Sequence, residues 1–108
     1  MTYIPKQGDM IWISLDLQLG HEQKGRRPGL VVSNDSFNKI TGLAVVCPIT
    51  NTNNGFPLHY KLKGYNTSGY LMIEHVKSMD YNARQVEYIE SLRNADLIEA
   101  ISMLNACF

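Results

Sequence analysis

The sequence has 108 residues, of which 44% are hydrophobic and 19% are charged. This length favours a single domain spanning residues 1–108, and the composition is typical of a folded globular domain and not of a disordered or fibrous chain. The formal net charge of zero excludes attachment to nucleic acid through bulk positive charge, although residues 20–39 hold a local excess of Lys and Arg.

Neither a membrane segment nor a metal site is expected from the sequence. The longest apolar run, residues 43–47, is far shorter than a membrane-spanning helix, and the first ten residues lack the apolar stretch of a signal peptide. We therefore expect a cytoplasmic protein. Cys47 and Cys107 form no C-x-x-C motif or disulfide framework, and the three histidines are too scattered to suggest ligation. We expect no metal and no cofactor.

The first half of the chain predicts three strands and a short helical turn. Residues 9–15 and 28–33 are rich in β-branched and aromatic side chains, which favours strands. Residues 33–36 offer N-cap side chains for a helical turn that ends at Gly42. The apolar residues 43–49 then predict the third strand.

The second half predicts shorter strands and one helix. Residues 51–57 form a dense cluster of turn formers, and residues 58–63 alternate in polarity as a half-exposed strand does. Three further short strands are expected at 70–73, 76–79 and 86–89. Near the end of the chain Leu97, Ile98, Ile101 and Leu104 follow helical spacing, with Ser91 or Asn94 as the expected N-cap. The fold class is therefore mainly β (α+β), a small bent sheet or barrel with a C-terminal helix packed on it.

The loop between the first two predicted strands, GHEQKGRRPG at residues 20–29, is dense in polar groups. Pro28 restricts the residue before it to extended geometry, so the guanidinium of Arg27 would project from a defined strand start. Such a planar, permanently charged fork suits a phosphate. Glu22 and His21 could accept a proton. An ordinary solvated loop with an ion pair between Glu22 and Arg27 explains the composition equally well.

Other polar residues are ambiguous by themselves. Thr50 ends an apolar strand and could donate a hydrogen bond to a phosphoryl oxygen, but a Thr in this place is more often part of a turn. His75 lies in a predicted strand segment between charged residues, where a structural role is the commoner one. Trp12 alternates with isoleucines, which favours a place in the core or at an interface.

Taken in order and spacing, five segments resemble the MazF/PemK family of toxin–antitoxin endoribonucleases. They are residues 8–12 (GDMIW), 20–28 (GHEQKGRRP), 31–33 (VVS), 48–50 (PIT) and 74–78 (EHVKS). The resemblance runs from about residue 5 to the C-terminal helix.

The resemblance implies an SH3-like β-barrel of the CcdB/MazF type, a homodimer, and sequence-specific, metal-independent cleavage of single-stranded RNA, including mRNA. The expected products carry a 2′,3′-cyclic phosphate and a 5′-hydroxyl, and the biological effect is inhibition of translation and growth. It also implies a MazE-like antitoxin whose acidic, flexible segment covers the RNA-binding surface.

Position by position, the resemblance implies three catalytic residues. Arg27 would stabilise the phosphorane, Thr50 would bond to the scissile phosphate, and Glu22 would accept a proton or order the loop. A further group of polar residues is expected to bind RNA: His21, Gln23, Lys24, Arg26, Asn51, His75 and Lys77. The family often has Gln where this sequence has His75, and Arg26 adds a second cation directly before Arg27.

Other classes remain open from the sequence. Related small barrels act as non-catalytic toxins that bind a protein such as DNA gyrase; they end in Trp-Gly-Ile, whereas this sequence ends in residues 105–108 (NACF). An inactive regulator or a plain SH3-like interaction module would not require Glu22, Arg27 and Thr50 together. These features favour the nuclease.

Overall fold

The structure is a computed structural model that describes residues 3–14, 25–52, 55 and 57–108. In chain order its elements are β1 (Asp9–Ser14), β2 (Arg26–Val31), α1 (Asp35–Thr41), β3 (Leu43–Thr50), β4 (His59–Lys61), β5 (Tyr70–Met72), the 3₁₀ turn η1 (Ile73–His75), β6 (Lys77–Asp80), β7 (Glu87–Ser91) and α2 (Asn94–Asn105). No helix among these described elements is long and apolar enough to cross a membrane.

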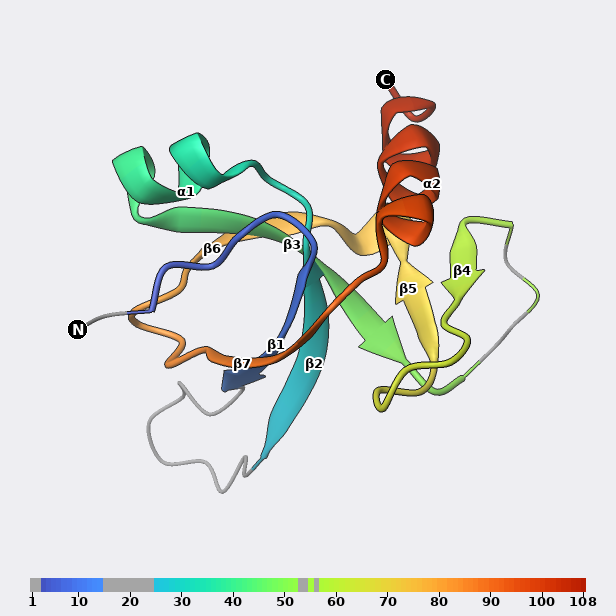
Figure 1. Ribbon diagram of the computed structural model, residues 1–108, viewed down its shortest axis with the longest axis horizontal. Coiled ribbons are helices and arrows are strands. Elements are labelled where there is room, and N and C mark those ends of the chain that lie inside the picture. The colour runs from blue at the N-terminus through green and yellow to red at the C-terminus, as the bar shows by residue number, and fades with distance from the viewer. Residues whose placement is uncertain (1–2, 15–24, 53–54, 56) are drawn as a thin grey trace.

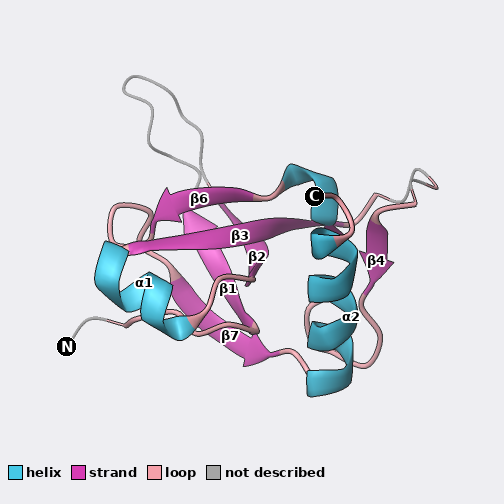
Figure 2. Cartoon of the chain, turned by 90° about the horizontal axis from the view of Figure 1, so that it is seen from above, coloured by secondary structure: helices cyan, strands magenta, loops and turns pink. Residues whose placement is uncertain are grey.

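The strands form one antiparallel sheet that bends strongly around β3. Their order is β4-β5-β3-β2-β1-β7. The remaining strand, β6, also pairs with β3. Residues 43–46 of β3 pair with β6, residues 46–48 pair with β2, and the last two residues pair with β5. Figures 1 and 2 show this arrangement, and in Figure 2 the two helices lie at opposite ends of β3. The predicted fold class, a bent β fold with a C-terminal helix, is confirmed, although the described strands do not close the sheet into a complete barrel.

Both faces of the central strands are buried, in two clusters of side chains. Because side chains alternate along a strand, adjacent residues of β1, β2 and β3 enter opposite clusters. The cluster beneath α2 contains Met10, Leu30, Cys47 and Ala100. The other contains Ile11, Val31, Val46 and Met79. This double burial explains why these strands appear in the sequence as continuous apolar runs.

The predicted start and end of the first helix are confirmed. The side chain of Asn34 accepts a hydrogen bond from the backbone N–H of Phe37 at 2.8 Å, which is the expected N-cap. Gly42 has a φ of +74° and its N–H bonds to the carbonyl of Asn38, so it ends the helix in the left-handed conformation that glycine adopts most easily.

Three local predictions in the second half of the chain are wrong. The strand expected at 58–63 is limited to His59–Lys61. His75 lies on η1 instead of a strand, because the chain turns between β5 and β6. The N-cap position of α2 is Arg93, with no side-chain cap. Ser91 cannot serve there, since it is the last residue of β7 and its hydroxyl bonds to that of Tyr88, and Asn94 is already helical.

The start of α2 is fixed instead by the carboxylate of Asp96. The hydroxyls of Tyr60 and Tyr65 each donate to Asp96 at 2.5 Å. The guanidinium of Arg93 lies 3.4 Å from the same carboxylate and stacks on the Tyr65 ring. The helix is thereby tied to β4 and to the turn that follows β4.

This contact predicts an acid-sensitive fold. The hydrogen bond from Tyr60, followed by that from Tyr65, holds the pKa of Asp96 below its ordinary value. A carboxyl whose pKa is lower in the folded chain stabilises the fold above its unfolded pKa of about 4, and the contribution is lost as the pH falls through the folded pKa. We expect the melting temperature of Asp96→Asn to fall less steeply below about pH 4 than that of the wild type. Equal slopes in a thermal-melting series would contradict this role.

Candidate active site

Arg26 and Arg27 are adjacent in sequence but lie on opposite faces of the sheet. Both belong to β2, where they pair with Ser14 and Ile13 of β1. Strand alternation sends their side chains in opposite directions. The two guanidinium groups therefore serve two different surfaces.

The Arg27 side chain lines a small cationic cavity of about 50 Å³. Its other lining residues come from three strands and the turn between β6 and β7: Ile13, Pro48, Lys77, Met79 and Arg84. Among the described residues that line it, three are cationic and none is a carboxylate. This is the charge pattern that an anion site requires, and the volume accommodates a phosphoryl oxygen but not a nucleobase.

Thr50 belongs to the same side of the sheet as Arg27. Gly29 of β2 pairs with Pro48 of β3, and this is the last pair between the two strands. Arg27 lies two residues before Gly29 and therefore on the same face of the sheet as Gly29 and Pro48. Thr50 is two residues beyond Pro48, and alternation gives both the same face. The Oγ1 atom of Thr50 accepts a hydrogen bond from the N–H of Thr52 at 3.2 Å. Its hydroxyl proton remains available for a second partner.

Arg26 and Asn51 meet on the other side, in a polar groove of about 480 Å³. We use this name for the surface formed by Trp12, Arg26, Pro28, Asn51, residues 66–68 and Ile89, in which polar side chains lie among apolar ones. The Arg26 guanidinium lies 4.4 Å from the centre of the Trp12 ring and 3.0 Å from the carboxylate of Glu87. Trp12 is half-buried beside a cation in the wall of this groove and belongs to neither buried cluster, so it is not a core residue. The alternative of a place at an interface stays a prediction.

The structure thus divides the RNA-binding residues expected from the sequence between two surfaces. Lys77 accompanies Arg27 in the cationic cavity, whereas Arg26 and Asn51 belong to the polar groove. His75 is exposed on η1, with its Nε2 3.6 Å from the carboxylate of Glu74. The remaining expected residues, His21, Glu22, Gln23 and Lys24, lie outside the described part of the chain.

Arg84 is a candidate that the sequence did not reveal. It lies in the turn between β6 and β7, its N–H bonds to the carbonyl of Asp80, and its carbonyl accepts from the N–H of Ser14 at 3.1 Å. This last contact docks the turn against the end of β1. Only the long-range pairing brings Arg84 beside Arg27, so no local motif could have identified it.

Cys47 and a metal site are two further possible sources of catalytic groups among the described residues. Burial, together with the charge of Glu74, raises the pKa of Cys47 to about 12, so its thiol remains protonated and is a poor nucleophile. No cluster of His, Cys, Asp or Glu capable of holding a metal ion occurs within residues 3–14, 25–52, 55 and 57–108.

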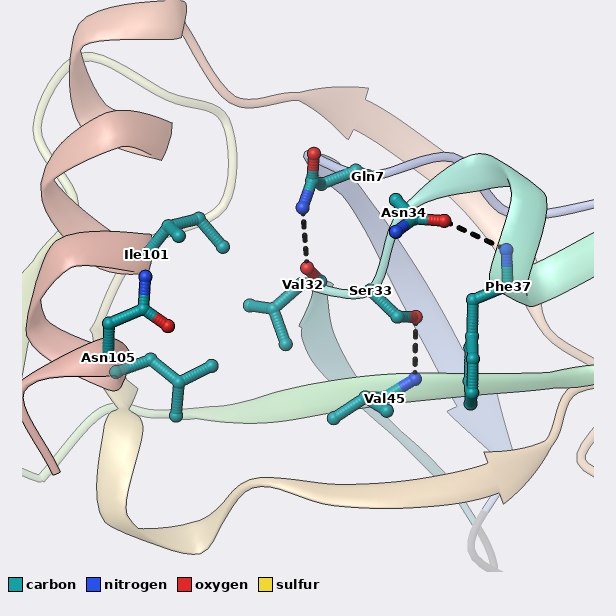
Figure 3. Close-up of a pocket in the computed structure, with 9 residues that line it drawn as sticks. Gln7, Val32, Ser33, Asn34, Phe37, Val45, Ile101 and Asn105 are labelled. Atoms are coloured by element: carbon teal, nitrogen blue, oxygen red, sulfur yellow. Dashed lines mark hydrogen bonds between the residues drawn. The ribbon is translucent and has the colours of Figure 1, made fainter. Parts of the chain in front are cut away.

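A second cavity, of about 300 Å³, lies between α1 and α2 (Figure 3). Its walls are largely apolar, with Val32, Val45 and Ile101 facing it, and the lining residues that the structure describes include no titratable side chain. The amide of Gln7 already donates to the carbonyl of Val32, and the N–H of Val45 donates to the hydroxyl of Ser33.

Comparison with known proteins identifies the family of this chain. Residues 6–108 match the family model described as PemK-like, MazF-like toxin of type II toxin-antitoxin system. The chain belongs to this toxin family. This match confirms the resemblance that the sequence motifs of the toxin indicated.

Individual relatives agree with that assignment. The toxin is 37% identical over 82 residues to the endoribonuclease toxin MazF of Escherichia coli K12, covering 76% of this chain and 74% of the relative. It is 31% identical over 105 residues to the endoribonuclease PemK of Escherichia coli, covering 93% and 79% of the two chains.

Solved structures share the fold of the toxin over nearly its whole length. MazF of Deinococcus radiodurans is 34% identical, with a TM-score of 0.84 over 98% of this chain and 97% of that one. A MazE-MazF structure from the same organism has a TM-score of 0.88 at 31% identity, over 97% and 96% of the two chains.

Proposed function

We propose that this endoribonuclease toxin cleaves single-stranded RNA without a metal ion, through attack of a ribose 2′-hydroxyl on the adjacent phosphorus. The bond from O2′ to phosphorus forms and the bond from phosphorus to O5′ breaks, which gives a 2′,3′-cyclic phosphate and a 5′-hydroxyl. One proton leaves O2′ and one reaches O5′. The observation that carries this proposal is the cationic cavity, with Arg27, Lys77 and Arg84 around one small space and Thr50 on the same face.

The described residues suit the electrostatic part of this reaction. Attack gives the phosphorus two negatively charged equatorial oxygens, and fixed donors at that place stabilise charge as it develops. Arg27 supplies a planar set of N–H donors, and Thr50 supplies a hydroxyl donor. Arg27 cannot act as a general base, because a guanidinium keeps its proton at pH values below ~12. In this proposal Glu22 accepts the O2′ proton, as the family resemblance implies.

A MazE-like antitoxin is the proposed protein partner. Structures of MazF relatives from Deinococcus radiodurans include MazE-MazF complexes. An acidic segment of such an antitoxin would compete with RNA for the cations of the cavity. We further propose that the toxin is a homodimer, like members of this family, and that it acts on RNA in the cytoplasm.

The deciding experiment is digestion of a long single-stranded RNA by the purified toxin in EDTA, followed by mapping of the cut sites and their end groups. Cuts at one short motif that leave cyclic phosphate and 5′-hydroxyl ends are the expected result. Cleavage that requires a divalent ion, or products with 5′-phosphate ends, would overturn the proposed chemistry. RNA that stays intact would instead favour a toxin that binds a protein target such as gyrase.

Thr50 provides a second test of the same site. Thr50→Val keeps the side-chain shape but removes the hydroxyl donor. Because a hydrogen bond to a charged group contributes about 1.5–3 kcal/mol, we expect cleavage to slow by about 10- to 100-fold. The measurement is the single-turnover rate on a defined RNA. Thr52→Val is the matched control, since only its backbone N–H contacts Thr50; equal rates for the two variants would remove Thr50 from the reaction.

A further inference from the structure

The first three residues of β2 are held by a neighbouring strand on one side only. Among the described strands, Arg26, Arg27 and Pro28 pair with β1 alone, because pairing with β3 begins at Gly29. Pro28 has no N–H and donates no backbone hydrogen bond to either side. The strand end that carries Arg27 therefore has less backbone support than Gly29 and Leu30, which pair with strands on both sides.

Like charges oppose the placement of Arg27 in the cationic cavity before RNA binds. Lys77 and Arg84 line the same cavity, and its described lining residues include no carboxylate. Repulsion between neighbouring cations favours a guanidinium that turns away into solvent. The direction of the Arg27 side chain therefore depends on how firmly the backbone of residues 26–28 is held.

A bridge of side chains on the opposite face of the sheet supports this strand end. The Arg26 guanidinium lies over the Trp12 ring and pairs with the carboxylate of Glu87. In the strand register, Trp12 of β1 lies between Pro28 of β2 and Glu87 of β7. The Arg26 side chain therefore crosses β1 and joins β2 to β7, three strands that are neighbours in the sheet (Figure 1). We call Arg26, Trp12 and Glu87 the three-strand bridge.

The middle strand of the bridge is a firm support. Ile11 and Ile13, on either side of Trp12, are buried. The N–H of Ser14 donates to the carbonyl of Arg84 at 3.1 Å, which holds the end of β1. Side chains that attach the start of β2 to this strand therefore attach it to the core of the fold.

The contacts of the bridge are weak one by one, but they act where small movements matter. The side chains of Arg26 and Glu87 are 54% and 67% exposed, and exposed ion pairs and cation–π contacts each contribute little. The rate of a reaction is far more sensitive to position, since a misplacement of about 1 Å can cost about 100-fold. A modest gain in order at residues 26–28 is therefore enough to change the rate.

We propose that the three-strand bridge positions Arg27, by holding the start of β2 so that the Arg27 guanidinium stays in the cationic cavity. This inference rests on the proposed function, in which Arg27 stabilises charge on the reacting phosphate. Arg26 is a positioning residue here, because it acts through its neighbour on the other face of the sheet. The RNA-binding role that its charge indicates in the sequence predicts different kinetics.

The first test is Glu87→Ala, assayed by single-turnover cleavage of an RNA that carries the mapped motif, over a series of toxin concentrations. Because the bridge loses its ion pair, we expect the maximal rate to fall by about three- to tenfold. Loss of a negative charge should leave RNA binding equal or tighter. Glu99→Ala, an exposed position of α2, makes the same change of charge and should keep the wild-type maximal rate. An unchanged maximal rate in Glu87→Ala would overturn the proposal.

Exchange of the two charges separates positioning from RNA binding. Arg26→Glu should lower the maximal rate at least as much as Glu87→Ala, since two carboxylates then face each other across β1. Combining Arg26→Glu with Glu87→Arg restores a pair of opposite charges and should recover most of the lost rate. If Arg26 instead contacts RNA directly, the double variant will stay as slow and as weakly bound as Arg26→Glu, and the positioning role is wrong.

Trp12 reports the bridge in the absence of RNA, since it is the one tryptophan in the sequence. The Arg26 guanidinium lies 4.4 Å from the centre of its ring. We expect acrylamide to quench Trp12 more strongly in Glu87→Ala than in the wild type, whereas Glu99→Ala should match the wild type. A thermal melt of each preparation shows whether it is folded. Equal quenching in the three folded proteins would overturn the bridge.

These measurements distinguish a failure of the bridge from a failure of the proposed function. A wild type that cuts RNA, with variants that cut equally fast, refutes the bridge alone. A wild type that leaves RNA intact refutes the proposed function, and the positioning of Arg27 then has no reaction to serve. The quenching of Trp12 is measured without RNA and does not depend on that outcome.

Discussion

Arg27→Ala is expected to slow RNA cleavage by at least about 100-fold while leaving the fold intact. Removal of one preorganised donor to a charged transition state costs about 10²- to 10³-fold in rate. The Arg27 side chain is exposed at the start of β2 and belongs to neither buried cluster. The measurement is a single-turnover cleavage assay combined with a thermal melt of the same preparation.

Two further variants separate charge from geometry at this position. Arg27→Lys keeps the positive charge but loses the planar set of donors, so its rate should lie between those of the wild type and Arg27→Ala. Lys39→Ala removes an exposed cation from the last turn of α1 and should cleave at the wild-type rate. Normal cleavage by folded Arg27→Ala protein would exclude this arginine from the reaction.

Gly69→Ala is expected to destabilise the fold by about 3 kcal/mol. This figure is the sum of the cost of a strained backbone conformation and the cost of a side chain placed too close to its neighbours. Gly69 has a φ of +127°, and a Cβ atom there would lie 2.5 Å from the backbone carbonyl oxygen of Thr50. Relief of that contact requires β3 and the turn at residues 66–68 to separate. We therefore expect a lower urea midpoint and a reduced cleavage rate in the same variant.

Gly42→Ala is the matched control for this effect. Gly42 also has a positive φ, of +74°, but nothing lies within 4 Å of the Cβ position. Its replacement should cost only about 1 kcal/mol, the ordinary penalty for a side chain in this conformation. If the two variants lose equal stability, the approach of Gly69 to Thr50 is not what makes glycine necessary there.

The sequence was sufficient where local chemistry decides the structure. Apolar content located the central strands, and Asn34 and Gly42 marked the limits of the first helix because each acts on backbone groups within a few residues. Pro28 was a misleading signal, since it set the predicted start of the second strand two residues late. Pairing with β1 extends β2 back to Arg26, which cannot be seen without the partner strand.

The candidate site was only partly predictable for the same reason. Arg27 and Thr50 were found through a family motif, and the strand register gives them a shared face. Arg84 reaches the cavity through contacts between distant segments, which no local pattern encodes. The division of Arg26 and Arg27 between two surfaces likewise depends on the exact start of a strand.

That division has a consequence for how such toxins diverge. Because Arg26 and Arg27 lie on opposite faces of β2, a substitution at residue 26 changes the groove without placing a new side chain in the cavity. The groove can therefore change by point mutation while the residues of the cavity stay the same. A single-residue insertion within β2 is different, since it would exchange the two surfaces and disrupt both at once.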